Sequence, residues 1–540
     1  MKKIIFILAI AAQTVLAQQT PKAPENWFNL DPDANQVYGV STEKTYKELL
    51  AGRKSKTVIV GVIDSGVDYN HEDLKDVMWT NEKEIPGNNI DDDKNGYIDD
   101  IHGWNFIGGK DGKNVEKETL ELTRAYGSLK KKYEGKDEKS LSGKEKEEYS
   151  LYNGYKSLYE KKINETEDQL SQINFFKTLT ETLQTEVKNQ LNTDKIDYEV
   201  LSKYKPSDVK LTQAHAFLSS MLKAQGGTLQ EFIEQLNEGV SRMKDMLDYN
   251  LNTEFDPRNI VGDNYENAEE RYYGNNDCIG PNALHGTHVA GIIAANRNNS
   301  IGINGVADNV RIMAIRAVPD GDERDKDVAN AIYYAVDNGA EIINMSFGKS
   351  ISYNKGAVDK AVKYAEEKGV LLVHAAGNDA LDIDQIIHFP CKKYESGKIA
   401  SNWIDVGALN WKLEKNAPAP FSNYGKKTVD VFAPGVDIYS TKNGGGYLDE
   451  SGTSMACPVT AGVAALLKSY FPHLSAKQIK DIIKASSRKD FKGKKVSLPG
   501  DKIEIDFAQL CSTGGVVNAY AAVKMAMKTK EKKRKIRSKF

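Results

Sequence analysis

The chain has 540 residues, 40% of them hydrophobic, and a formal net charge of −3. This length exceeds that of one ordinary compact domain, so the sequence predicts at least two folded parts with ample apolar core. A net charge so close to zero argues against a nucleic-acid partner for the chain as a whole. Four cysteines in a chain of this size exclude a disulfide scaffold.

The first 17 residues have the features of an export signal. Two lysines precede a short apolar run at residues 4–12, and residues 15–17 (VLA) provide the small residues of a cleavage site. The apolar run is too short to span a bilayer, and a buried N-terminal strand is the alternative. The expectation is a signal peptide, residues 1–17, and an exported mature protein, periplasmic or extracellular, with no membrane insertion.

After an N-terminal extension at residues 18–50, the sequence takes on the pattern of an α/β domain. Residues 57–63 (TVIVGVI) form a continuous β-branched run, typical of a strand buried on both faces. Similar runs recur at residues 310–318, 340–345, 370–373 and 403–408. Helical patterns lie between these runs, near 328–336 and 356–367. This alternation predicts a parallel sheet flanked by helices, with functional residues at the carboxyl ends of its strands.

An acidic run follows the first predicted strand. Asp91, Asp93 and Asn95 alternate in sequence, and Gly96 permits a sharp turn, as in the first half of a calcium-binding loop. Tyr97, Asp99 and Asp100 supply further oxygen ligands. Hard oxygen ligands at this density suit Ca²⁺, so a structural calcium site is expected, with an acidic surface turn as the alternative. His102 stands where an EF-hand has its closing glutamate, which excludes an EF-hand.

Residues 109–262 have a different composition, rich in Lys, Glu, Gln and Leu. Seven apolar side chains recur every three or four residues and predict a stripe along one long helix: Leu170, Ile173, Phe176, Leu179, Leu183, Val187 and Leu191. Further helices are expected at 207–223 and 228–249. We interpret the region as a mainly α-helical subdomain inserted into the α/β domain. Its role stays open between a solvated decoration, a lid, an inhibitory segment and a partner-binding arm.

The α/β domain would then comprise residues 51–108 and 263–527, followed by a basic tail at residues 528–540. Such a tail is usually solvated and disordered.

Hydrolysis of an amide by a serine needs a base for the hydroxyl, a partner for the base and donors for the oxyanion. Asp64 directly follows the strand at 57–63, and His285 opens the run HGTHVAG. Ser454 stands in SGTSMACP, before an apolar helix, where a helix N-terminus favours negative charge. Asn378 ends VLLVHAAGN and can point its amide into the same cleft.

Each of these motifs has a simpler explanation when taken alone. Asp64 can cap a turn, Ser454 can cap a helix, and AAGN is a turn signal. His285 and His288 have a spacing that permits a shared metal, although no nearby carboxylate or third histidine completes such a site.

Five motifs in this order resemble the subtilisin-like serine peptidases, or subtilases: VIDSGV around Asp64, HGTHVAG from His285, NMSFG at 344–348, AAGN ending at Asn378, and SGTSMACP around Ser454. The resemblance covers roughly residues 58–107 and 282–523. The order Asp, His, Ser is that of subtilisin itself.

The resemblance implies a role for each matched residue. Asp64 would orient His285, His285 would act as general base, and Ser454 would form the acyl-enzyme. Asn378 would donate to the oxyanion. In the family, the segment that matches Ser346, Phe347 and Gly348 lines the substrate channel and pairs with the substrate backbone. Calcium-stabilised loops are common in the family, and no organic cofactor is implied.

Two features depart from the compact family pattern. Asp64 and His285 are 221 residues apart, mostly because of the helical region. Only roughly 40 residues separate residue 18 from the first predicted strand, too few for the longer folded propeptide that many relatives carry.

The sequence therefore predicts an exported serine endopeptidase that acts on protein or peptide substrates. The alternatives are a processing protease gated by the helical insertion, and an inactive binding protein that works through that insertion.

Overall fold

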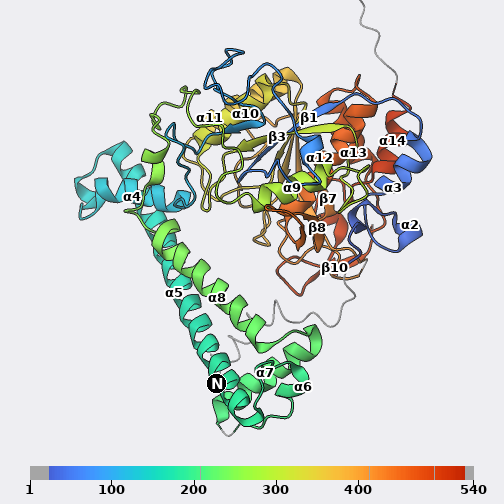
Figure 1. Cartoon of the computed structure of the whole chain (residues 1–540). Helices are drawn as coiled ribbons and strands as arrows, with labels where there is room; N and C mark the ends of the chain where they lie inside the picture. The colour runs from blue at the N-terminus through green and yellow to red at the C-terminus, as the bar shows by residue number, and fades with distance from the viewer. Residues whose placement is uncertain (1–22, 207, 413, 492, 530–540) are drawn as a thin grey trace, which may run out of the picture. The chain divides into compact units, whose positions relative to one another are not determined.

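The structure is a computed structural model that describes residues 23–206, 208–412, 414–491 and 493–529 (Figure 1). The predicted signal peptide and nearly all of the predicted basic tail lie outside the described residues. The described chain forms two compact units. The first, residues 122–255, is called the helical unit, and the second, residues 23–121 together with the chain from Asp256 onward, is called the α/β unit.

A seven-stranded sheet in the order β2-β3-β1-β4-β5-β6-β7 is the centre of the α/β unit, and every pair of neighbouring strands is parallel. The strands are β1 (Val58–Asp64), β2 (Gly103–Asn105), β3 (Val310–Arg316), β4 (Ile342–Met345), β5 (Leu371–Ala375), β6 (Trp403–Leu409) and β7 (Val431–Pro434). All five strands expected from apolar runs are present. The predicted parallel sheet is confirmed, and the short strands β2 and β7 escaped prediction.

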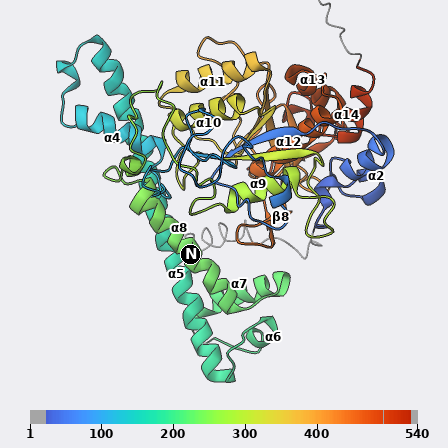
Figure 2. The ribbon, with the colours of Figure 1, turned by 45° about the horizontal axis from the view of Figure 1, so that its top comes forward.

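Helices cover both faces of the sheet (Figure 2). Alternate residues of β1, such as Val60 and Ile63, enter different apolar cores because successive side chains of a strand point to opposite faces. One core includes α9 (Leu284–Ala294), α12 (Thr453–Tyr470), α13 (Ala476–Ser486) and α14 (Ala519–Ala526). The other includes α10 (Asp325–Asp337) and α11 (Lys355–Lys368), which pack side by side. Burial on both faces explains why the strands read as continuous apolar runs.

Smaller elements complete the α/β unit. The N-terminal extension forms α2 (Pro32–Asn35) and α3 (Thr42–Thr45), and its Trp27 is fully buried with the indole N–H donated to the Asp437 carbonyl at 2.9 Å. Two antiparallel pairs follow: β8 (Ile438–Thr441) with β9 (Tyr447–Glu450), and β10 (Lys495–Ser497) with β11 (Glu504–Asp506). The extension therefore belongs to the core of the α/β unit.

The helical unit contains α5 (Gly143–Leu191), a helix of 49 residues, with α4 (Glu121–Tyr133), α6 (Tyr198–Leu201), α7 (Val209–Gln225) and α8 (Leu229–Asp245). The predicted stripe lies on α5, where Phe176, Leu183 and Val187 share a buried cluster with residues of α7 and α8. Capping boxes begin α5 and α8, at Ser142 and Thr228. The flanking segments 109–121 and 256–262, which the sequence grouped with the insertion, place Val115 and Val261 in a core of the α/β unit.

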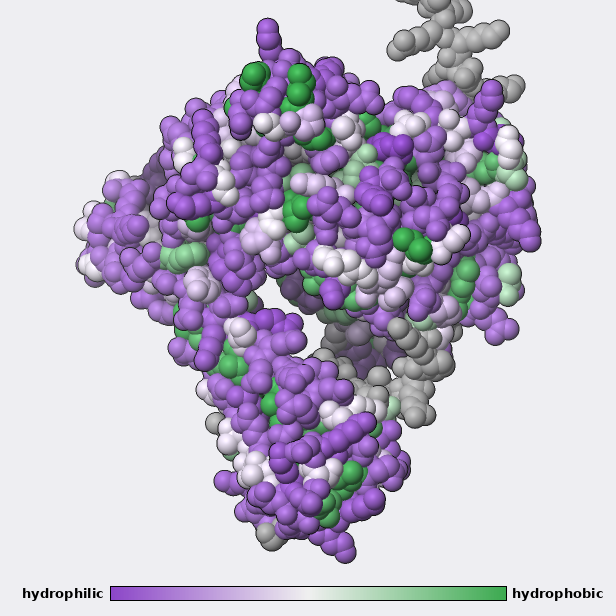
Figure 3. Space-filling model, in the orientation of Figure 1, coloured by the Kyte–Doolittle hydropathy of each residue, from purple (hydrophilic) through white to green (hydrophobic). Residues whose placement is uncertain are grey.

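Among the described residues, no helix combines the length and apolarity needed to cross a membrane. The face drawn in Figure 3 is mostly hydrophilic, with scattered hydrophobic residues. Isolated exposed apolar side chains are normal on a folded protein.

Candidate active site

Asp64 and His285 form a hydrogen-bonded pair at the carboxyl end of the sheet. Asp64 is the last residue of β1 and 1% exposed, and His285 is the second residue of α9. The His285 Nδ1 lies 2.7 Å from Asp64 Oδ1. Gly286 permits this approach, because a Cβ at that position would lie 2.1 Å from the Gly66 carbonyl oxygen. The structure thus brings together two residues that are 221 positions apart.

The state of His285 follows from this pair. Because an ionised carboxylate only accepts, Nδ1 carries the proton that is donated to Asp64, and Nε2 of the neutral ring keeps its lone pair. Burial disfavours the imidazolium, but the charge and hydrogen bond of Asp64 outweigh it and raise the pKa of His285 above 6.5. The His285 side chain is 41% exposed, so Nε2 belongs to a ring that a substrate can reach. His285 can therefore take and return a proton.

Ser454 is the second residue of α12, so its backbone N–H belongs to the first turn, whose N–H groups lack partners within the helix. Among the described residues, the one hydrogen bond of Ser454 Oγ is donated to the Ser346 carbonyl, at 3.2 Å. Catalytic hydrogen bonds often shorten only when substrate binds. Gly452, the N-cap residue of α12, has an extended backbone with φ 171°.

The Asn378 side chain is held in one orientation. Its Oδ1 accepts from the Thr453 backbone N–H at 2.9 Å and from the Thr453 hydroxyl at 3.0 Å. Because a backbone N–H can only donate, this contact fixes which end of the amide is oxygen and leaves Nδ2 to donate elsewhere. Gly377, with φ 101°, makes the turn, and a Cβ there would meet Asn423 Nδ2 at 2.3 Å. An amide donor therefore stands beside the N-terminus of α12.

Ser346, Phe347 and Gly348 follow β4 directly, beside Ser454. The Ser346 hydroxyl donates to the Ser454 carbonyl at 2.9 Å and accepts from Asn344 Nδ2 at 3.0 Å. Cys457 donates its thiol to Asn344 Oδ1 at 3.1 Å. Cys457 is fully buried and burial raises the pKa of its thiol, so it is a packing residue and not a second nucleophile.

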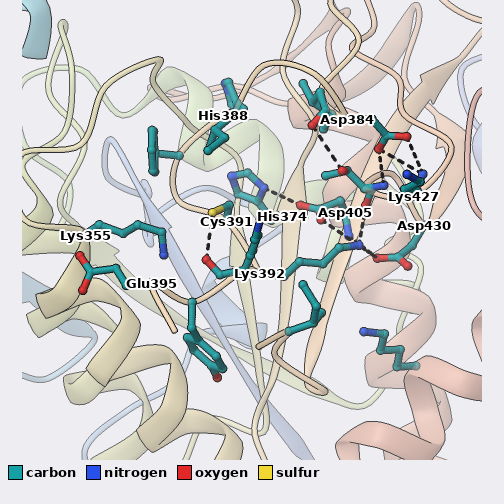
Figure 4. A pocket seen from close by; sticks show the side chains of 18 of the residues that line it. Lys355, His374, Asp384, His388, Cys391, Lys392, Glu395, Asp405, Lys427 and Asp430 are labelled. Atoms are coloured by element: carbon teal, nitrogen blue, oxygen red, sulfur yellow. Dashed lines mark hydrogen bonds and ion pairs between the residues drawn. The ribbon is translucent and has the colours of Figure 1, made fainter. Parts of the chain in front are cut away.

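A buried ionic network of His374, Asp405, Lys392 and Asp430 is drawn in Figure 4. It contacts the segment 346–348 through the Phe347 carbonyl. His374 Nε2 contacts the Phe347 carbonyl at 3.0 Å, and His374 Nδ1 contacts Asp405 Oδ1 at 3.0 Å. Both neighbouring atoms can accept hydrogen bonds, so His374 links the Phe347 backbone to the Asp405 carboxylate. Burial opposes ionisation of Asp405, but Lys392 and His374 lower its pKa to about 2.

The network continues to Asp430, which receives Lys392 Nζ at 2.9 Å. It borders a cavity of about 790 Å³ that also contains His388. The His388 ring lies against Gly348 and Gly377, where a Cβ would meet ring atoms at 2.2 Å and 3.0 Å. Sequence analysis did not identify these residues. For two of them the sequence offers a clue, because an ionisable side chain interrupts an apolar strand run: His374 in VLLVHA and Asp405 in WIDVGA.

The acidic run near β2 gathers three carboxylates. In the described part of the chain, carboxylate oxygens of Glu84, Asp91 and Asp93 lie within 4.8 Å of one another. The two Asp99 oxygens accept from the backbone N–H groups of Gly87 and Asn89, both at 2.9 Å. Glu84, which precedes the acidic run and was not among the predicted ligands, joins Asp91 and Asp93.

The three clustered carboxylates accept hydrogen bonds from the loop, and the remaining predicted ligands also have hydrogen-bond partners. Asp100 accepts from Asn81, Asn95 and Tyr334, while Asn95 Oδ1 accepts from the Tyr97 backbone N–H at 2.8 Å. Burial raises the pKa of Asp100 to about 6, against the lowering effect of these donors. The cluster of Glu84, Asp91 and Asp93 therefore offers the most compact set of hard oxygen ligands for a divalent cation.

His288 has the environment of a core histidine. Its Nε2 lies 3.0 Å from the Ile438 carbonyl and 3.2 Å from the Leu448 carbonyl, and burial lowers its pKa to about 4. With Nε2 donating to carbonyls and His285 Nδ1 donating to Asp64, these nitrogens are not free to share a metal.

Together, the sheet and this constellation define a class: a parallel α/β fold whose strand ends and helix N-termini carry Asp, His, Asn and Ser, the residue types that acyl transfer by a serine uses. The chain belongs to the subtilase family, whose family model matches residues 55–501. The resemblance read from the five motifs is thereby confirmed.

Individual relatives match parts of the chain. A thermophilic serine proteinase of Bacillus sp. (strain AK1) is 48% identical over 186 residues, covering 34% of this chain and 42% of the relative. Subtilisin DY of Bacillus licheniformis is 41% identical over 207 residues, covering 38% of this chain and 70% of the relative. In four curated relatives the match spans between 42% and 60% of the relative's own length.

Among solved structures, a protease from Pseudoalteromonas arctica PAMC 21717 is 29% identical, with a TM-score of 0.38, covering 47% of this chain and 78% of that one.

Proposed function

We propose that this protein is an exported serine endopeptidase that hydrolyses peptide bonds through an acyl-enzyme on Ser454. The observation that carries the proposal is the 2.7 Å contact between His285 Nδ1 and Asp64. This contact leaves Nε2 of the partly exposed His285 ring free to act as a base. Ser454 stands at the N-terminus of α12. The names of the relatives, a serine proteinase and an extracellular protease among them, agree with this activity and with export.

In the proposed reaction, substrate backbone lies along Ser346–Gly348 next to Ser454. His285 Nε2 takes the Ser454 proton while Oγ attacks the carbonyl carbon, and Asp64 stabilises the resulting imidazolium. The new oxyanion is held by Asn378 Nδ2 and the Ser454 backbone N–H. The imidazolium then protonates the leaving amine as the C–N bond breaks, and a water molecule, deprotonated by His285, releases the acyl group from Ser454.

Calcium is the proposed structural ion. Glu84, Asp91 and Asp93 would hold it, and its charge would offset these three carboxylates. Among the described residues, Asp93 has an ammonium nearby, that of Lys83 at 3.7 Å. The ion has no part in the reaction steps above.

The proposal is tested by hydrolysis of denatured casein by mature protein that begins at residue 18. We expect native protein and a Ser300→Ala control, altered in an exposed loop serine, to release peptides at equal rates, and Ser454→Ala to release none. Failure of the native protein to cleave, with its fold intact, would favour an inactive binding protein that works through the helical unit. Cleavage that begins only after a cut within residues 122–255 would favour the gated processing protease.

A further inference from the structure

A second cavity, of about 330 Å³, opens beside His285. Asp64, Ser65 and Ser346 line one part of it, so it adjoins the proposed catalytic groups. Its volume is at the lower end of the range for small-molecule sites, which is enough for one long side chain. A substrate held at Ser454 would therefore place one of its side chains against this cavity.

The charge of the cavity wall is predominantly negative. Four carboxylates line it, from Asp64, Glu116, Asp320 and Glu450, against a single guanidinium from Arg316. Asp64 is paired with His285, and Asp320 with Lys117 at 2.6 Å. Within the described chain, neither the Glu116 nor the Glu450 carboxylate has a salt bridge or hydrogen bond. These two acids are thus available to an incoming cation.

Arg316 does not offer its charge to a ligand. The side chain is 2% exposed, and three of its N–H groups are donated to the Ser65 carbonyl, Asn105 Oδ1 and the Val115 carbonyl. A Cβ at Gly280 would lie 2.3 Å from Arg316 Nε, so the guanidinium is enclosed on that side too. An anionic side chain would meet the carboxylates of the wall and not this cation.

Two buried polar atoms of the wall lack protein partners. Asp64 Oδ2 and Ser65 Oγ are buried without a hydrogen bond among the described residues, and Asp64 is 1% exposed. Buried polar atoms in native proteins usually have partners, so an unpaired carboxylate oxygen beside a cavity points to a donor supplied from outside. An ammonium or guanidinium group brings several such donors and no acceptor.

We propose that this cavity is a specificity subsite that takes a lysine or arginine side chain of the substrate next to the scissile bond. Glu116 and Glu450 provide the selecting charge, and three N–H groups of Arg316 are already donated to protein acceptors. This inference rests on the proposed endopeptidase function and adds a substrate class to it.

The test compares pairs of quenched fluorescent peptides that differ only in lysine against norleucine, at each of three positions on either side of the bond cleaved. At one position we expect lysine to raise kcat/KM. Glu450→Gln and Glu116→Gln should each reduce that preference by about twofold to fivefold, the range for exposed ion pairs. A matched Glu25→Gln variant, altered in an exposed glutamate of the same unit, should leave it unchanged.

Binding of the same peptides to the Ser454→Ala variant, measured by fluorescence anisotropy, tests the subsite without requiring peptide hydrolysis. Tighter binding of the lysine peptide that weakens in Glu450→Gln/Ser454→Ala supports the subsite even if hydrolysis fails. Equal binding and equal kcat/KM for lysine and norleucine at all six positions, or a lysine preference unaffected by both glutamate substitutions, would overturn it.

Discussion

The α/β unit and the helical unit of this chain are stabilised by different patterns of side-chain burial. In the α/β unit, apolar strands buried on both faces end in polar residues, and Asp64, His285 and Asn378 are each held by a specific contact. In the helical unit, α5 presents a stripe of apolar side chains to α7 and α8, and most of its other positions are polar and at least partly exposed. The comparison teaches that the proposed active site depends on a few residues held in one orientation by specific hydrogen bonds. The packing of the helical unit depends instead on apolar side chains repeated along each helix.

The largest expected effect comes from removing the nucleophile. We expect Ser454→Ala to lower kcat by about 10⁶-fold, because loss of one member of such a triad removes nearly all of its contribution. The melting temperature should stay close to that of the native protein, since the Ser454 hydroxyl makes one hydrogen bond. A loss of folding in Ser454→Ala, measured by circular dichroism, would instead assign this residue a structural role.

A smaller loss is expected at Asn378. Asn378→Ala should lower kcat by about 100- to 1,000-fold with little change in KM, because the amide donates to charge that develops in the transition state. Asn378→Asp is the matched variant: it keeps an acceptor for Thr453 but loses the NH2 group, so it should be as slow as Asn378→Ala. Full activity of either variant would exclude Asn378 from the oxyanion hole.

Leu183→Ala tests whether the helical unit can be destabilised without a change in peptide hydrolysis. The side chain is fully buried in the cluster of α5, α7 and α8, so its truncation should cost about 2–5 kcal/mol of unfolding free energy. Hydrolysis of a short peptide should keep its kcat/KM, because no proposed catalytic residue lies in residues 122–255. A change in kcat/KM at temperatures where the variant is folded would show that the units are energetically coupled.

The pH dependence follows from His285. The neutral ring is the base, so kcat/KM should rise with pH through the raised pKa of His285, above 6.5, and fall as pH drops below it. The sign for stability is opposite. Because the folded-state pKa is raised, the contribution of the Asp64–His285 pair to stability is complete below pH 6.5 and is lost as pH rises through the folded-state pKa. Asp64→Asn should shift the activity profile to lower pH, and an unchanged profile would contradict this assignment.

Calcium should have the smallest effect, confined to stability. At a calcium concentration 100 times the Kd, binding to the folded state adds about 2.7 kcal/mol, which raises the melting temperature. Asp91→Asn should remove most of this increase, and Asp99→Asn, whose carboxylate accepts two loop N–H groups, should lower stability with or without calcium. An equal calcium response in native protein and Asp91→Asn would exclude the cluster as the site.

Sequence alone predicted the parallel sheet, because its strands are apolar runs of β-branched residues. It predicted the family from five motifs in order, because each motif taken alone has a simpler explanation. It could not find Glu84, whose approach to Asp91 depends on how a loop folds. It also missed His374 and Asp405, because each is a single polar residue inside an apolar strand and only the pairing of β5 with β6 brings the two together. The stripe on α5 was predictable from its period. The tyrosine cluster that holds α4 and the first part of α5 also recurs every three or four residues, at Tyr149, Tyr152, Tyr155 and Tyr159, but the sequence analysis did not identify it.

The most direct test of the central claim is reaction of the mature protein with a fluorophosphonate probe, followed by mass spectrometry of its peptides. We predict one covalent adduct, on Ser454, that is absent from Ser454→Ala and strongly slowed in His285→Ala. Native, folded protein that gains no adduct, or gains it on another serine, would contradict the assignment of Ser454 as the activated nucleophile.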